Sequence, residues 1–203
     1  NFSGVMSGTG SVTKNGPGIL VLSGANTFTG SVLVNAGTLQ LLTNALSVAG
    51  TLKVYGGTFD ANGLAATVTG LTTISGGTYL AGTGLQTFNG GLVVSSGSFT
   101  GSSGSVTVNG SLTISGMGTL SAPSGTFNVS GNWINSGGTF TSGSNTVTFN
   151  GGSAAIDPGG TGAGQAFYKV IINSTGTKTV ASALVINNNL QVDSGILAGD
   201  YDV

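Results

Sequence analysis

The sequence lacks four residue types that carry much of protein chemistry. Its 203 residues include no cysteine and no histidine, and arginine and glutamate are also missing. Disulfide scaffolds, zinc sites built from thiolates or imidazoles, and nucleophilic catalysis by cysteine or histidine are therefore excluded. Bidentate binding of carboxylates or phosphates by arginine is excluded as well. The lack of cysteine suits a bacterial protein that is secreted through an oxidising periplasm.

Charge is also scarce, since only 4% of the residues are charged, whereas soluble domains average about 25%. The charged residues are Lys14, Lys53, Lys169, Lys178, Asp60, Asp157, Asp193, Asp200 and Asp202. With a net charge of -1, the chain has no basic field to attract a polyanion, so nucleic acid is not an expected partner. Gly, Ser, Thr or Asn interrupts every apolar stretch, so no transmembrane segment is expected.

Glycine is abundant, with 39 copies, and it marks a repeat of about 20 residues. In one series a Gly-Thr or Gly-Ser pair precedes a large apolar residue, and in a second series an apolar residue stands two positions before a glycine. The first series supplies Leu39, Phe59, Tyr79, Phe99, Leu120 and Phe140, and the second supplies Val48, Val68, Phe88, Val108, Val129 and Phe149. Because glycine tolerates positive φ, we expect the repeated glycines to form the corners of each repeat.

Within each repeat, apolar residues alternate with small or polar ones, as in Leu112-Thr113-Ile114 and Val106-Thr107-Val108. This alternation is typical of strands and not of helices. The pattern predicts an all-β fold, a parallel β-solenoid with about 20 residues and three short strands per rung. The two apolar series are expected to form columns of core side chains.

A third series lies between the core positions and is expected to face solvent. It is the possible surface ladder Thr38, Thr58, Thr78, Thr119 and Thr139. A flat array of threonines suggests an ice-binding solenoid as a minor alternative function. Ser98 interrupts the ladder, and the residues two positions further along each strand are too varied to form a second row.

The acidic residues offer little for catalysis or metal binding. Polysaccharide-degrading β-helix enzymes need clustered carboxylates or basic residues, whereas Asp60 stands alone and Asp157 precedes a Pro-Gly turn. We therefore expect no enzyme activity, no catalytic residue, no cofactor and no assigned metal site. Asp193, Asp200 and Asp202 would be able to form a weak calcium site, and ordinary solvated turns explain them more simply.

The repeat divides the chain into four parts. Residues 1-36 form N-terminal rungs, 37-151 the regular 20-residue rungs, 152-166 an inserted turn-rich loop, and 167-203 the C-terminal rungs. The chain opens at Asn1 without a signal-peptide pattern, so we expect a mature product or an excised piece. The motif stops at Val203 without a polar capping rung, and solenoids need caps. An uncapped edge predicts end-to-end self-association, or association with another surface protein.

One segment carries a family resemblance. Gly10-Ser11-Val12-Thr13-Lys14-Asn15-Gly16-Pro17-Gly18-Ile19-Leu20-Val21-Leu22-Ser23-Gly24-Ala25-Asn26-Thr27-Phe28-Thr29-Gly30, followed by Val34-Asn35-Ala36-Gly37-Thr38-Leu39, closely resembles the autotransporter-associated β-strand repeat of bacterial passenger domains. The resemblance implies a right-handed β-helix that is exported to the bacterial cell surface or beyond it. It also implies a family whose members commonly serve in adhesion, autoaggregation or biofilm structure.

Together these features predict a structural extracellular β-solenoid that acts as an adhesin stalk, a biofilm-matrix component or a fibre-forming segment. The alternative is a polysaccharide-binding or polysaccharide-degrading β-helix, with glycans as partners and a groove beside the 152-166 loop as its expected site.

Overall fold

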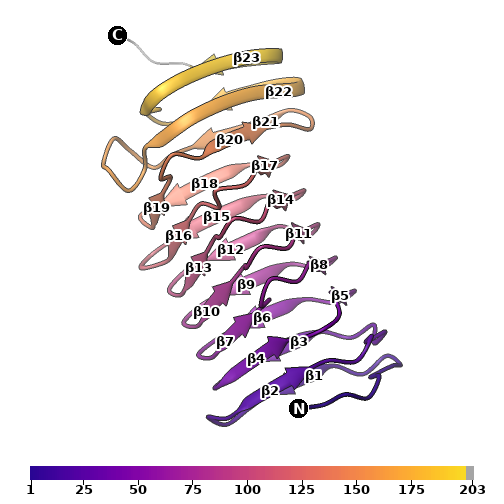
Figure 1. Ribbon diagram of the computed structural model, residues 1–203. Coiled ribbons are helices and arrows are strands. Elements are labelled where there is room, and N and C mark those ends of the chain that lie inside the picture. Colours follow the sequence, from indigo (N-terminus) through magenta and orange to yellow (C-terminus); the bar gives the residue numbers. More distant parts are fainter. Residues whose placement is uncertain (200–203) are drawn as a thin grey trace.

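The protein is a parallel β-solenoid in the computed structural model, which describes residues 1-199. About nine turns of about 20 residues each stack along one axis, and the described part of the chain forms strands and no helix. Figure 1 shows the chain winding from the N-terminus at one end of the stack toward the C-terminus at the other. The predicted all-β solenoid is therefore confirmed.

The strands of successive turns form two parallel sheets, one of 16 strands and one of seven, and the larger sheet has two arms. The first arm consists of β1 (Val12–Lys14), β3 (Val32–Val34), β6 (Leu52–Val54), β9 (Thr72–Ile74), β12 (Leu92–Val94), β15 (Leu112–Ser115), β18 (Trp133–Ser136) and β21 (Ala154–Asp157). The second arm consists of β5 (Leu46–Val48), β8 (Ala66–Val68), β11 (Gln86–Phe88), β14 (Val106–Val108), β17 (Phe127–Val129) and β20 (Thr146–Phe149). The seven-stranded sheet consists of β2 (Ile19–Leu22), β4 (Thr38–Leu41), β7 (Thr58–Asp60), β10 (Thr78–Leu80), β13 (Ser98–Thr100), β16 (Thr119–Ser121) and β19 (Thr139–Thr141).

The two arms are joined by long strands at the C-terminal end of the described chain. The strands β22 (Phe167–Val180) and β23 (Ile186–Gly199) have 14 residues each. The first half of β22 pairs with β20, and its last residues pair with β21. β23 pairs with β22 along its length, with register shifts on the way. These strands therefore continue both arms around the corner between them (Figure 1).

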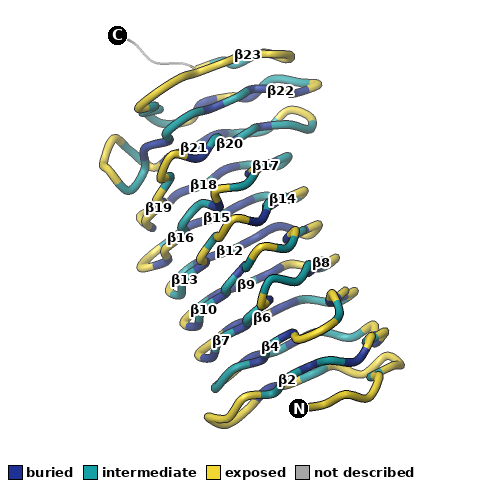
Figure 2. The backbone as a smooth tube through the Cα atoms, viewed as in Figure 1, coloured by how far each residue is buried: buried dark blue, intermediate teal, exposed yellow. Residues whose placement is uncertain are grey.

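The core runs as columns along the solenoid axis, because each strand pairs in register with its equivalents in the turns before and after it. Tyr79, for example, pairs with Phe59 on one side and Phe99 on the other, and the ring centroids lie 4.9 Å and 5.2 Å apart. Every residue of the two predicted apolar columns is buried. Figure 2 shows these buried positions recurring from turn to turn inside the coil, while β23 is largely exposed.

The close approach of successive turns explains much of the glycine content. A Cβ atom on Gly77 would lie 2.3 Å from the carbonyl oxygen of Gly57, in the turn below. Gly77 is not among the glycines with positive φ, so it is required for space and not for its backbone conformation. The expectation that these glycines serve to reach positive φ is therefore wrong at Gly77. It holds at Gly37 of the same column, whose φ is 66°.

The segment 152-166 is not a loop throughout, as the sequence led us to expect. Residues Ala154–Asp157 form β21, and Ile156 pairs with Trp133 and is fully buried. The segment stays in register with its neighbours through strand pairing to β18 and β22. Residues 158-166 do form an irregular excursion, and its Gly164 carbonyl accepts a hydrogen bond from the Phe140 backbone N–H at 2.7 Å. The excursion thus lies against β19, the last described strand of the seven-stranded sheet.

Candidate functional site

The threonine ladder lies on the outer face of the seven-stranded sheet. Thr38, Thr58, Thr78, Thr119 and Thr139 occupy one column with Ser98, and each side chain is partly or fully exposed. Within this column the Ser98 hydroxyl donates to Thr78 Oγ1 at 3.2 Å. In the neighbouring outward column Gln40 Nε2 donates to Asp60 Oδ2 at 2.7 Å, where a second threonine row would be needed. The ladder is therefore a single row of hydroxyl groups.

A polar network lies inside the core. The Tyr79 hydroxyl donates to Gln86 Oε1 at 2.5 Å, and both side chains are fully buried. The Gln86 amide in turn donates to the carbonyls of Leu64 at 3.0 Å and Gly84 at 2.8 Å. Burial raises the pKa of Tyr79 well above its usual value. The hydrogen-bonded and inaccessible position of this network indicates a structural role.

Two lysines, Lys14 and Lys178, are buried, although lysine is usually a surface residue. Lys14 Nζ donates to the carbonyls of Asn15, Gly16 and Ala36, at 3.1, 2.7 and 3.0 Å. Its position pairs with the core residue Val34, so the alternation of core and surface positions was the signal that could have revealed it. A lysine at a strand corner reaches backbone carbonyls that the turn leaves free.

Lys178 is the more completely buried of the two, with no exposed surface. Its Nζ donates to the Ser130 carbonyl at 3.0 Å, across a separation of 48 residues in the sequence. Burial away from water lowers the pKa of Lys178, because desolvation penalises the charged amine. No acidic residue of the described chain forms an ion pair with it within 4.0 Å.

The acidic residues are separated from one another. Asp157 Oδ1 accepts hydrogen bonds from the Ser182 hydroxyl and the Gly159 N–H, and Asp193 Oδ1 accepts one from Gln191 Nε2 at 2.6 Å. Across residues 1-199, no group of three potential ligand residues is placed to hold a metal ion. The candidate calcium cluster includes Asp200 and Asp202, which lie outside the described residues, so that site stays a prediction.

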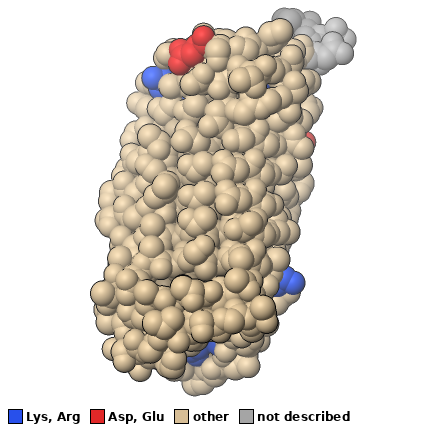
Figure 3. Space-filling model, turned by 90° about the vertical axis from the view of Figure 1, so that its right-hand side faces the viewer, with Lys and Arg blue, Asp and Glu red and all other residues tan. Residues whose placement is uncertain are grey.

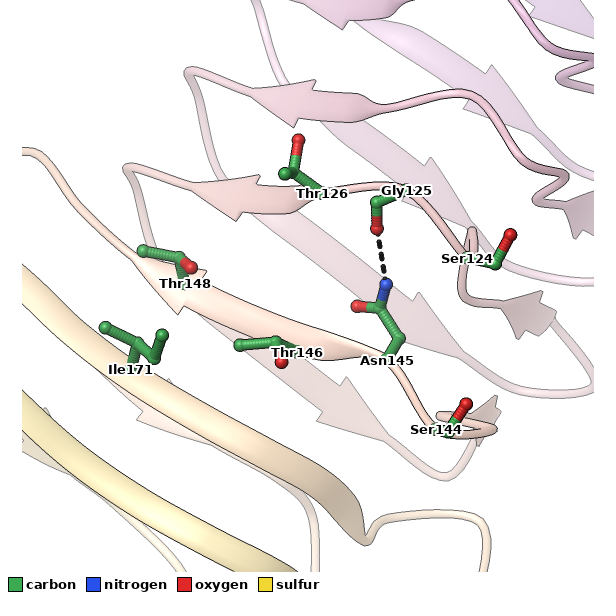
Figure 4. Close-up of a pocket in the computed structure, with 8 residues that line it drawn as sticks. All are labelled: Ser124, Gly125, Thr126, Ser144, Asn145, Thr146, Thr148 and Ile171. Carbon is green, nitrogen blue, oxygen red and sulfur yellow. Dashed lines mark hydrogen bonds between the residues drawn. The ribbon is translucent and has the colours of Figure 1, made fainter.

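A hollow lies on the outer surface where the seven-stranded sheet turns into the second arm. Its volume is about 450 Å³, and we call it the Asn145 groove (Figure 4). It is lined by Ser124, Gly125, Thr126, Ser144, Asn145, Thr146, Thr148 and Ile171. A smaller hollow of about 230 Å³ adjoins it and shares Ser124, Ser144 and Asn145. Neither hollow is lined by a residue of 152-166, the segment beside which the sequence placed a groove.

The surface around these features carries little charge. Figure 3 shows one side of the molecule, and the middle of that side is nearly free of lysine and aspartate side chains. A search of the described residues for a helix that is long and apolar enough to cross a membrane found none. The side shown in Figure 3 thus consists mainly of uncharged residues.

Comparison with known protein families finds a match at the beginning of the solenoid. Residues 12–41 match the model of the passenger-associated transport repeat. They contain β1 to β4, the beginning of the solenoid, and include the buried Lys14. No curated protein and no solved structure matches the chain. The match thus identifies a passenger-associated transport repeat in the first turns of this β-solenoid.

Proposed function

We propose that this chain is a structural, non-enzymatic segment of a bacterial surface or secreted passenger protein, where it serves as a rigid extracellular stalk. The observation that carries the proposal is the register of the stack. Strands of one turn pair in parallel with those of the next, from Val12 in β1 to Val180 in β22. About nine turns at about 4.8 Å each give a rod on the order of 45 Å long.

Each turn is held by its neighbours on both sides. Backbone hydrogen bonds join successive turns even at the corners, as from the Ser95 N–H to the Ile74 carbonyl at 2.9 Å. The apolar columns bury nearly every large inward side chain of the regular turns. Such a stack offers few extended exposed segments that a protease could bind, which suits a stalk outside the cell.

Self-association is part of the proposal, with β23 as the contact edge. Leu190 and Val192 continue the inward columns of Val170 and Ile172, but they are 44% and 50% exposed. Among residues 1-199, β23 pairs only with β22. A turn of a second copy stacked on β23 would bury these side chains and pair with the strand.

Electron microscopy and light scattering test the stalk and its association. Negative-stain images of the purified chain should show short rods that resist added protease, and the scattering mass should grow with concentration. Val192→Lys, which places a charge on the exposed core column of β23, should abolish that growth, whereas Thr179→Lys on the outer surface of β22 should not. Compact, rapidly digested particles would refute the stalk, and concentration-independent mass would refute the end-to-end contact.

The adhesive role is tested on whole bacterial cells. We expect bacteria that display this chain on their surface to attach to plastic or to one another more than cells that display the empty carrier. If the two strains attach equally, the adhesive role is refuted and the chain acts only as a spacer.

A further inference from the structure

The Asn145 groove contains hydroxyl groups that the protein itself does not use. Thr126, Thr146 and Thr148 face outward from β17 and β20 or just before them, and Ser124 and Ser144 stand on the turns that precede these strands. Within residues 1-199, none of these five side-chain hydroxyls forms a hydrogen bond with another protein group. The Ser98 and Thr78 hydroxyls of the surface ladder, in contrast, bond to each other. The groove therefore presents free donors and acceptors at its walls.

Asn145 supplies a second and independent feature. Its side chain is only 7% exposed, and its Nδ2 donates to the carbonyls of Pro123 and Gly125, each at 2.6 Å. Its Oδ1 is buried and has no hydrogen-bond partner in the described structure. Figure 4 shows the Nδ2 atom directed at the Gly125 carbonyl. The Asn145 amide thus fixes the corner through its two hydrogen bonds to backbone carbonyls, and this corner forms one side of the groove.

The lining restricts the chemistry of that ligand. No charged residue lines the groove, so phosphate groups and other strongly anionic ligands lack the cation they need. Ile171 of β22 adds an apolar wall beside the hydroxyl groups. A volume of about 450 Å³ lies within the usual range for small-ligand sites. A ligand with many hydroxyl groups, no charge and one apolar C–H face matches these walls.

We propose that the Asn145 groove binds a segment of a neutral polysaccharide. Sugar hydroxyls exchange hydrogen bonds with the outward hydroxyls of Ser124, Thr146 and Thr148. The C–H face of a sugar ring packs on Ile171. This binding activity goes beyond the stalk function and would let the same segment attach to a glycan.

Binding measurements with defined oligosaccharides test the proposal. The probes are neutral hexasaccharides of β-linked glucose, α-linked glucose and β-linked N-acetylglucosamine, titrated into the purified chain by calorimetry. We expect at least one of them to bind, and we expect Thr148→Val and Ser124→Ala each to weaken it about threefold to tenfold, the usual effect of losing one neutral hydrogen bond. Thr87→Val is the matched control, since Thr87 occupies the same outward column on β11, away from the groove.

Three results would overturn the proposal. The first is that none of the neutral probes binds at millimolar concentration. The second is an equal loss of affinity in Thr87→Val. The third is binding of acidic hexasaccharides alone that Lys169→Met abolishes, because Lys169 pairs with Thr146 at the end of the groove. If each variant unfolds at the same temperature as the unmodified protein, a loss of affinity arises in the groove and not from misfolding. If the protein still forms rods in electron micrographs, the stalk function stands even where no oligosaccharide binds.

Discussion

The hydroxyl of Tyr79 donates to Gln86 Oε1 at 2.5 Å in the middle of the solenoid core, where neither side chain has any exposed surface. Gln86 stands in a column between Ala66 and Val106, so its amide would be unpaired without Tyr79 and the two carbonyls that it contacts. The hydrogen bond thus links the seven-stranded sheet to the second arm across the interior of one turn.

We expect Tyr79→Phe to destabilise the protein by about 1–3 kcal/mol, because Gln86 Oε1 would remain buried without a donor. Gln86→Leu should be destabilising as well, since it leaves the Tyr79 hydroxyl and two carbonyls unpaired. The double variant should cost less than the sum of the single variants, as measured by urea unfolding. Strict additivity would show that the two side chains are not coupled.

Alkaline pH should destabilise the protein through Tyr79. Its pKa is raised by burial in the folded state, so the unfolded chain loses this proton more easily, near the usual pKa of 10.0. The contribution to stability is therefore complete below about pH 10 and is lost as the pH rises further. Unfolding free energies measured across that range should fall less steeply for Tyr79→Phe than for the unmodified protein. Parallel curves would contradict the assignment.

Lys178 should give the opposite pH dependence. Burial lowers its pKa in the folded state, so below the usual value of 10.5 the unfolded chain binds a proton more readily than the folded one. The free energy of unfolding should therefore fall as the pH falls from 10.5 toward the folded-state pKa. Lys178→Met should be more stable than the unmodified protein near neutral pH, and this advantage should shrink toward pH 10.

Lys53→Met is the control for Lys178, because Lys53 lies on the exposed face of β6. It should leave the pH dependence of unfolding unchanged. If Lys178→Met and Lys53→Met give the same curve, the burial of Lys178 has no influence on stability.

Gly77→Ala should be destabilising by about 1–3 kcal/mol, the usual cost of overpacking. The added methyl group would lie 2.3 Å from the Gly57 carbonyl oxygen and 2.6 Å from a Val54 methyl group. Gly18→Ala is the matched control, since a Cβ there meets no atom within 4 Å and φ is not positive. Thermal unfolding should separate the two variants by several degrees, and equal midpoints would refute the close-approach explanation.

The Asn145 groove could not be predicted from the sequence, although one signal was present. Asn145 stands in the column where the two preceding turns have Gly125 and Gly104. A larger side chain at a glycine position indicates a local change in the corner. The Ser and Thr residues that line the groove cannot be distinguished in the sequence from the other Ser and Thr residues of the repeat. The 20-residue period predicts which residues face outward, but it does not predict where the surface forms a hollow.

The sequence by itself determined the period, the three strands per turn and the apolar columns, because alternation in a strand and repetition between turns both follow from local spacing. Only the tertiary structure decided which polar side chains lie in the core. Lys14, Lys178 and Gln86 are polar and buried because corner carbonyls and Tyr79 lie within reach of their side chains. Ala36 and Ser130 come from other turns, and Tyr79 comes from another strand of the same turn as Gln86, so these contacts exist only once the chain has coiled and its turns have stacked.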